Sequence, residues 1–147
     1  MPKDERPAIA PHVFAIRVYY EDTDAAGIVY YANYLRFAER ARSELLHSMG
    51  FSAARVTAEQ GVTLVVRWCE IDYLAPAKLD DVLEIHTRIL ELDGARLSAE
   101  QTVHCAGRAI CRLRLRLVSI SREGRPTRMP PELHDAFMAL VQPGEAA

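Results

Sequence analysis

The sequence has few cysteines, no long apolar segment and no excess of charge of either sign. Its three cysteines are an odd number and form no Cys-x-x-Cys pair, which favours free thiols in a reducing compartment over disulfides. No apolar segment approaches the roughly 18 residues that span a bilayer, and the charged N-terminus lacks the apolar region of a signal peptide. The 18 basic residues are offset by 20 acidic ones, so nucleic acid is not expected as a partner. We expect a cytoplasmic protein without membrane insertion.

The sequence also lacks the motifs of several catalytic classes. It has no Gly-x-Ser-x-Gly elbow for a serine nucleophile. Its five histidines form no His-x-x-x-His pair, which argues against a metal site. The acidic segment that begins at Asp22 fails as a calcium loop, because Ala26 and Asn33 occupy ligand positions. We therefore expect neither a metal nor a cofactor.

What the sequence does contain is enough for one folded domain. Its 147 residues are 50% hydrophobic and 26% charged, as in an ordinary globular protein. Residues 1–11 contain three prolines and predict a flexible N-terminal leader. Residues 12–141 form the predicted domain, and residues 142–147 a C-terminal tail.

One long helix is predicted over about residues 31–49. Apolar side chains recur there three or four residues apart, which is the period of an amphipathic helix, and Gly50 is a suitable C-terminal stop. The predicted apolar stripe consists of Leu35, Ala38, Arg42, Leu45 and Met49, widened by Phe37, Ala41 and Leu46.

The remaining segments have the two-residue period of strands. Segment 12–20 is rich in β-branched and aromatic residues, and segments 62–73, 83–89, 97–105 and 109–117 alternate after the helix. A hairpin is expected at Asp93-Gly94 and a tight turn at Gly107. A short helix is expected from Pro131 to about Val141, since proline is tolerated in a first helical turn. Four apolar side chains of the second strand are expected on one face: Val62, Leu64, Val66 and Trp68.

This order of elements predicts an α+β fold. A meander of antiparallel strands has one apolar face that needs a cover, and the long helix supplies it. A five-stranded antiparallel sheet wrapped around one long helix is the hotdog fold.

The candidate chemistry lies in segment 19–34. Two acidic residues, Asp22 and Asp24, follow the first strand, and a turn at Gly27 leads to the helix. A carboxylate that faces a helix N-terminus can act as nucleophile or base, while the free N–H groups hold the charge that develops on a carbonyl oxygen. The segment therefore indicates acyl transfer or hydrolysis.

The chain resembles the hotdog thioesterases of the 4-hydroxybenzoyl-CoA thioesterase type, most of all the branch called tol-pal system-associated acyl-CoA thioesterases. The resemblance rests on segments 17–24, 27–34, 39–42 and 72–85. It implies hydrolysis of acyl-CoA, with Asp24 as the catalytic acid and the backbone N–H of Tyr31 as the oxyanion donor. It also implies a dimer with edge-to-edge sheets and active sites at the subunit boundary. Many relatives in this branch have a histidine at the position of Tyr31 and a glycine at that of Ala26.

Two mechanisms and one structural alternative are open for Asp24. The carboxylate can attack the thioester carbon to give a mixed anhydride, or it can activate a water molecule. Alternatively, Asp24 only caps the turn into the helix, which is also the role expected for Asp22. The substrate-binding candidates, some of which could equally belong to the core, are Gly27, Ile28, Val29, Tyr30, Asn33 and Tyr34.

Other functions and partners are weighed against this hypothesis. A hotdog dehydratase needs a histidine at the helix start, and residues 28–34 contain none. A thioesterase acting on acyl carrier protein and a non-catalytic acyl-CoA-binding or scaffold protein are the alternatives. The stripe formed by Arg112, Arg114 and Arg116 is interpreted as a solvated sheet face, an interface between dimers or an attractor of coenzyme A phosphates. A homodimer or homotetramer is expected, because exposed sheet edges need protection.

Overall fold

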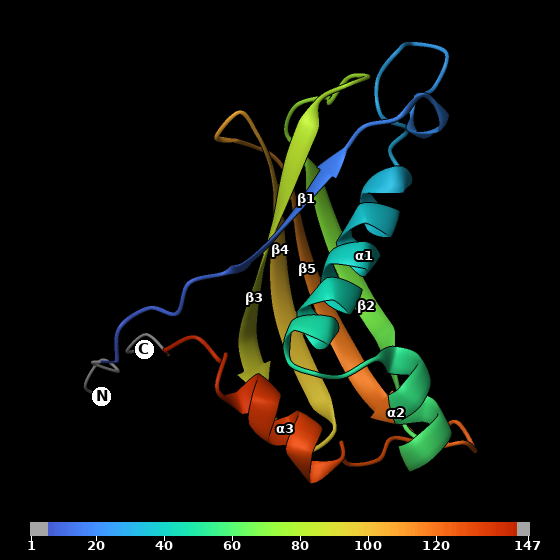
Figure 1. Cartoon of the computed structure of the whole chain (residues 1–147), viewed down its shortest axis with the longest axis vertical. Coiled ribbons are helices and arrows are strands. Elements are labelled where there is room, and N and C mark those ends of the chain that lie inside the picture. Colours follow the sequence, from blue (N-terminus) through green and yellow to red (C-terminus); the bar gives the residue numbers. More distant parts are fainter. Residues whose placement is uncertain (1–5, 144–147) are drawn as a thin grey trace.

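The structure, a computed structural model, describes residues 6–143. Five strands form one antiparallel sheet in the order β1-β3-β4-β5-β2. The strands are β1 (His12–Arg17), β2 (Thr63–Tyr73), β3 (Val82–Leu92), β4 (Arg96–Cys105) and β5 (Arg108–Ile120). The helices are the 3-10 turn η1 (Tyr20–Asp22), α1 (Asn33–Ser48), α2 (Ala53–Gln60) and α3 (Pro131–Met138). The curved sheet wraps around α1, with α2 and α3 at one end (Figure 1). The predicted hotdog arrangement is confirmed.

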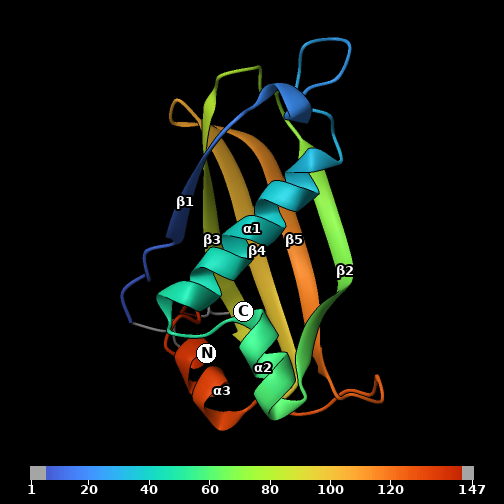
Figure 2. The ribbon, with the colours of Figure 1, turned by 45° about the vertical axis from the view of Figure 1, so that its right-hand side comes forward.

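The core lies between α1 and the concave face of the sheet (Figure 2). Phe37, Ala38 and Ala41 of α1 are at most 1% exposed, and the alternating apolar side chains of β3, β4 and β5 face them. Leu35, which the helical period places on the apolar stripe, is nevertheless 43% exposed.

Both predicted turns are present. The Asp93 carboxylate accepts hydrogen bonds from the N–H groups of Ala95 and Arg96, and these bonds lower the pKa of Asp93. Ala106 and Gly107 both have positive φ, 50° and 78°, which is the geometry of a tight two-residue hairpin.

Strand β2 departs from the predicted alternation at Arg67. The register with β5 shifts there, so that Val66 lies opposite Leu117 but Trp68 lies opposite Arg116. Leu117 belongs to the core face, whereas Arg116 is exposed on the outer face, where its guanidinium carbon lies 4.5 Å from the centroid of the Trp68 ring. The prediction that Trp68 shares a face with Val66 is therefore wrong, because a β-bulge inserts one extra residue.

The sequence interpretation also missed helix α2 and extended the first strand too far. That strand ends at Arg17, and Tyr20–Asp22 forms the 3-10 turn instead. Helix α2 has clear boundary residues: the Ser52 hydroxyl accepts from the Arg55 N–H at 3.2 Å, and Gly61 ends the helix with φ 67°. No residue of α2 is fully buried.

The described parts of the expected leader and tail are bonded to each other. The backbone of Ile9 donates to and accepts from the side-chain amide of Gln142, at 3.2 and 2.8 Å. The rest of the two segments, residues 1–5 and 144–147, lies outside the described residues. Within residues 6–143, no helix is long and apolar enough to cross a membrane.

Candidate active site

The loop between β1 and α1 is fixed by the connection between β2 and β3. The N–H of Val18 donates to the carbonyl of Asp81 at 2.8 Å, and the N–H of Val29 to that of Ala77 at 2.9 Å. The acidic loop and segment 72–85, which are far apart in the sequence, therefore meet beside the start of α1 (Figure 2).

Asp22 holds this loop in shape. It is only 8% exposed, and its Oδ2 accepts from the N–H of Tyr19 at 2.8 Å. Its carbonyl accepts from the N–H of Tyr30 and from the side-chain amide of Asn33, both at 2.9 Å. The structural role expected for Asp22 is confirmed.

Asp24 stabilises a turn through one of its carboxylate oxygens and leaves the other outside the turn. Its Oδ1 accepts from the N–H of Ala26 at 2.8 Å, its N–H donates to the carbonyl of Ile28, and its carbonyl accepts from the N–H of Gly27. Gly27 has φ 78°, which favours glycine. Oδ2 accepts no hydrogen bond from residues 6–143. The half-buried side chain is therefore fixed through one oxygen only.

The start of α1 has no capping side chain. Its N-cap residue, Ala32, cannot supply one, and its first turn has no acidic residue. Just before the helix, the N–H of Tyr31 finds no acceptor among residues 6–143. Free N–H groups at a helix start carry partial positive charge. This end of α1 can therefore bind a negatively charged oxygen.

Four tyrosines gather at the same end of α1, namely Tyr30, Tyr31, Tyr34 and Tyr73. The sequence alone does not single out Tyr73. The Tyr73 hydroxyl donates to the carbonyl of Tyr31 at 2.9 Å. The ring centroids of Tyr31 and Tyr73 lie 6.1 Å apart, and those of Tyr30 and Tyr31 4.9 Å apart. Tyr73 is 43% exposed, and desolvation raises its pKa. Its only signal in the sequence was its position in segment 72–85.

The substrate-binding candidates divide into exposed and buried residues. Gly27 and Tyr30 are exposed and Ile28 is half-buried. The others, Val29, Asn33 and Tyr34, are 8% exposed or less. The Tyr34 hydroxyl accepts from the N–H of Ala77 at 3.2 Å. The buried side chains thus pack the loop onto α1, while the exposed residues are free to contact a ligand.

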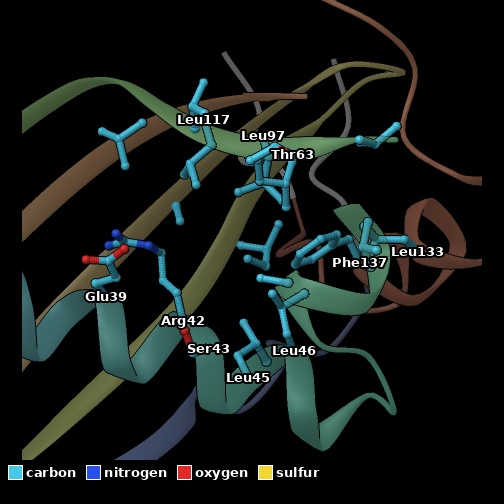
Figure 3. Close-up of a pocket in the computed structure, with 18 of the residues that line it drawn as sticks. Glu39, Arg42, Ser43, Leu45, Leu46, Thr63, Leu97, Leu117, Leu133 and Phe137 are labelled. Atoms are coloured by element: carbon cyan, nitrogen blue, oxygen red, sulfur yellow. The ribbon is translucent and has the colours of Figure 1, made fainter. Parts of the chain in front are cut away.

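A cavity of about 360 Å³ lies farther along α1 and is not lined by Asp24 or Tyr31. Glu39 and Arg42 of α1 stand at one end of it, and Leu133 and Phe137 of α3 at the other (Figure 3). No group of three His, Cys, Asp or Glu side chains suited to a metal ion is found within the described part of the chain.

Comparison with known proteins identifies the family. The model of the Thioesterase-like superfamily matches residues 18–137. The chain belongs to this superfamily. This thioesterase-like chain is 38% identical to the acyl-CoA thioesterase YbgC of Haemophilus influenzae. The alignment of 128 residues covers 86% of the chain and 94% of that relative. It is 50% identical over 88 residues to the acyl-CoA thioester hydrolase YbgC of Escherichia coli O6:H1, covering 60% of the chain and 65% of that protein.

A solved structure confirms the fold of this thioesterase-like chain. A probable thioesterase from Bartonella henselae superposes with a TM-score of 0.79 at 40% identity, covering 82% of the chain and 100% of that protein. The resemblance seen in the acidic loop and in segment 72–85 is thereby confirmed at the level of the family.

Proposed function

We propose that this chain hydrolyses acyl-CoA thioesters to a free acid and coenzyme A. The observation that carries the proposal is the junction of the acidic loop and α1. Within residues 6–143, neither the Oδ2 of Asp24 nor the N–H of Tyr31 has a hydrogen-bond partner, and both lie at this end of the helix. The two YbgC relatives named above, one an acyl-CoA thioesterase and one an acyl-CoA thioester hydrolase, support the same reaction.

Asp24 acts through Oδ2, as a nucleophile or as a general base. As a nucleophile, Oδ2 attacks the carbonyl carbon, the thiolate of coenzyme A leaves, and water then hydrolyses the mixed anhydride. As a base, Oδ2 takes a proton from the attacking water. The bond from Ala26 to Oδ1 orients the carboxylate in either case. Because a thiolate is a good leaving group, neither route requires a strong general acid.

The start of α1 stabilises the oxyanion. The N–H of Tyr31 donates to the thioester oxygen as charge develops on it, and a single donor of this kind contributes about 10²-fold to 10³-fold in kcat. The Tyr73 hydroxyl, bonded to the Tyr31 carbonyl, positions this residue. Since the donor is a main-chain group, a tyrosine serves here as well as a histidine.

The replacement of Asp24 by asparagine tests the mechanism. With a panel of acyl-CoA thioesters and a thiol-release assay, Asp24→Asn should lower kcat at least about a hundredfold, because the amide is neither a nucleophile nor a base. Glu21→Gln is the matched control, since Glu21 is an exposed acid of the same loop. Full activity of Asp24→Asn would refute the assignment.

Two further measurements separate the open alternatives. In a single turnover in H₂¹⁸O, ¹⁸O in the enzyme carboxylate identifies Asp24 as a nucleophile whose mixed anhydride is opened at the aspartyl carbon. Label in the product acid alone is expected for a general base and for anhydride opening at the acyl carbon. Rates on acyl-CoA and on the matching acyl carrier protein thioester identify the preferred donor. Binding of acyl-CoA without thiol release would indicate a scaffold.

We also propose that the active chain is a homodimer or homotetramer. Strand β2 is an edge of the sheet with β5 as its one neighbour, and its Val66 and Tyr73 side chains are 44% and 43% exposed. Exposed edges of this kind are usually paired or covered. A monomer by light scattering at assay concentrations would contradict the proposal.

A further inference from the structure

The cavity beside α1 is apolar along most of its length. It lies between the C-terminal half of α1, helices α2 and α3, and the concave face of the sheet (Figure 3). Its volume of about 360 Å³ falls within the range of small-molecule pockets. Apolar side chains from four elements form its far part, namely Leu45, Leu46, Val56, Leu64, Leu133 and Phe137.

The end of the cavity nearer the start of α1 is polar, and its Arg42 and Thr87 side chains both bond to the buried Gln101. Arg42 Nη1 donates to Gln101 Oε1 at 2.8 Å. Gln101 Nε2 donates in turn to the carbonyl of Ala38 and to Thr87 Oγ1, at 2.9 and 3.0 Å. Gln101 is fully buried. Gln101 lies behind the lining and joins two lining side chains, Arg42 and Thr87, so a saturated chain can pass them without removing these hydrogen bonds.

A line of side chains on α1 leads from the candidate active site toward this cavity. Leu35, Glu39, Arg42 and Leu46 are spaced by four, three and four residues, which places them on one face of the helix, and Tyr31 lies just before its start. Glu39, Arg42 and Leu46 line the cavity. Leu35 precedes them and is 43% exposed, which an apolar residue of the helical stripe would not be if it packed in the core.

Edge strand β2 forms the opposite side of this path. Tyr73 lies against Tyr31 at the start of α1, and Val66 and Leu64 line the cavity at the other end. Tyr73 and Val66 are 43% and 44% exposed. Partly exposed apolar side chains therefore lie on both sides of the space between the thioester site and the cavity.

We infer that this cavity binds the distal half of a linear aliphatic acyl chain, an inference that rests on the proposed thioester hydrolysis. An α-helix rises 1.5 Å per residue, so Glu39 lies about 9 Å and Leu46 about 20 Å beyond Asn33 along the helix axis. An extended chain advances about 1.2 Å per bond. About eight bonds therefore reach the cavity and about sixteen fill it. Short acyl chains, and an aromatic ring joined directly to the thioester, do not reach it.

A chain-length series tests the inference. We expect kcat/KM of the full chain to rise at least about tenfold from butanoyl-CoA to hexadecanoyl-CoA, because the added methylene groups enter an apolar cavity. Val56→Phe, which fills the cavity from α2, should lower the ratio of kcat/KM for hexadecanoyl-CoA to that for butanoyl-CoA about tenfold. Ala54→Phe adds the same ring to an exposed position of α2 outside the lining and is the control. Ala53→Phe is a second filling variant in case Val56→Phe does not fold.

The outcomes separate this inference from the proposed function. If butanoyl-CoA and hexadecanoyl-CoA are hydrolysed equally well, and the filling variants do not change their ratio, the cavity is not an acyl site although hydrolysis stands. If no thioester is hydrolysed, the proposed function fails, and calorimetric binding decides about the cavity. Tighter binding of hexadecanoyl-CoA than of butanoyl-CoA that Val56→Phe abolishes would then support the inference, and equal binding would overturn it.

Discussion

Replacing Gln101 by leucine tests how strongly the buried polar cluster stabilises the fold. Gln101 is 0% exposed, and its amide joins Arg42, Ala38 and Thr87 through three hydrogen bonds. Leucine removes all three bonds at nearly constant volume. The Ala38 carbonyl lies inside α1 and already accepts a backbone hydrogen bond of the helix, so it loses only its second donor. The Arg42 guanidinium and the Thr87 hydroxyl, which is 3% exposed, are the groups left without this partner.

The magnitude follows from those two groups. A buried polar group that loses its partner costs about 1 to 3 kcal/mol, and more if it is charged, so the free energy of unfolding should fall by about 3 kcal/mol. For a domain of this size, that loss lowers the melting temperature by roughly 10 °C. Urea unfolding of the two proteins under the same buffer conditions measures the difference. Thr102→Val, on the outer face of the same strand, should change stability by no more than about 0.5 kcal/mol.

A double-mutant cycle with Arg42→Met makes the test specific. If Gln101 stabilises the fold through Arg42, the double variant should be about 1 to 3 kcal/mol more stable than the sum of the single effects predicts. Strictly additive effects, or a loss below about 0.5 kcal/mol for Gln101→Leu, would refute the reasoning.

Three further predictions concern pH, the acidic loop and α2. Burial raises the pKa of the Cys111 thiol from 9.0 to about 12, so above pH 9 the unfolded chain binds fewer protons than the folded one. The free energy of unfolding should then fall by about 1.4 kcal/mol per pH unit. Urea unfolding between pH 9 and 11 measures this fall. The same slope of unfolding free energy against pH in Cys111→Val would contradict the prediction. Gly27→Ala should cost about 1 kcal/mol in urea unfolding through its φ of 78° alone, since no atom lies within 4 Å of an added Cβ; a neutral effect would argue against the turn. Ser52→Ala removes the cap of α2 at a cost of about 1 kcal/mol, and faster hydrogen exchange confined to the amides of α2 should reveal it.

Much of the fold could be predicted because local patterns determine it. The alternation in β3, β4 and β5 and the helical period of α1 each describe a face that packs on the core. Helix α2 lacked such a pattern, since none of its residues is buried. The bulge at Arg67 could not be predicted either, because only the pairing with β5 reveals that one residue is in excess.

The candidate site was partly predictable for the same reason. Asp24 and Tyr31 lie in one continuous segment around Gly27, where the turn and the helix start are local features. Tyr73 reaches the site through a long-range contact with Tyr31. The cavity is formed by side chains from both ends of the chain, so no single segment could have indicated it.

The residue in excess in β2 lies between two stretches of regular pairing with β5. Beyond Arg67 the bulge reverses the order of inward and outward positions, so Tyr73 lies opposite Cys111 on the inner side of the sheet. If Arg67 were deleted, Trp68 would directly follow Val66 and still lie opposite Arg116, so Tyr73 would stay on the inner side. The strand can therefore lose its irregular residue, whereas the number of residues between Trp68 and Tyr73 keeps the Tyr73 hydroxyl on the Tyr31 carbonyl.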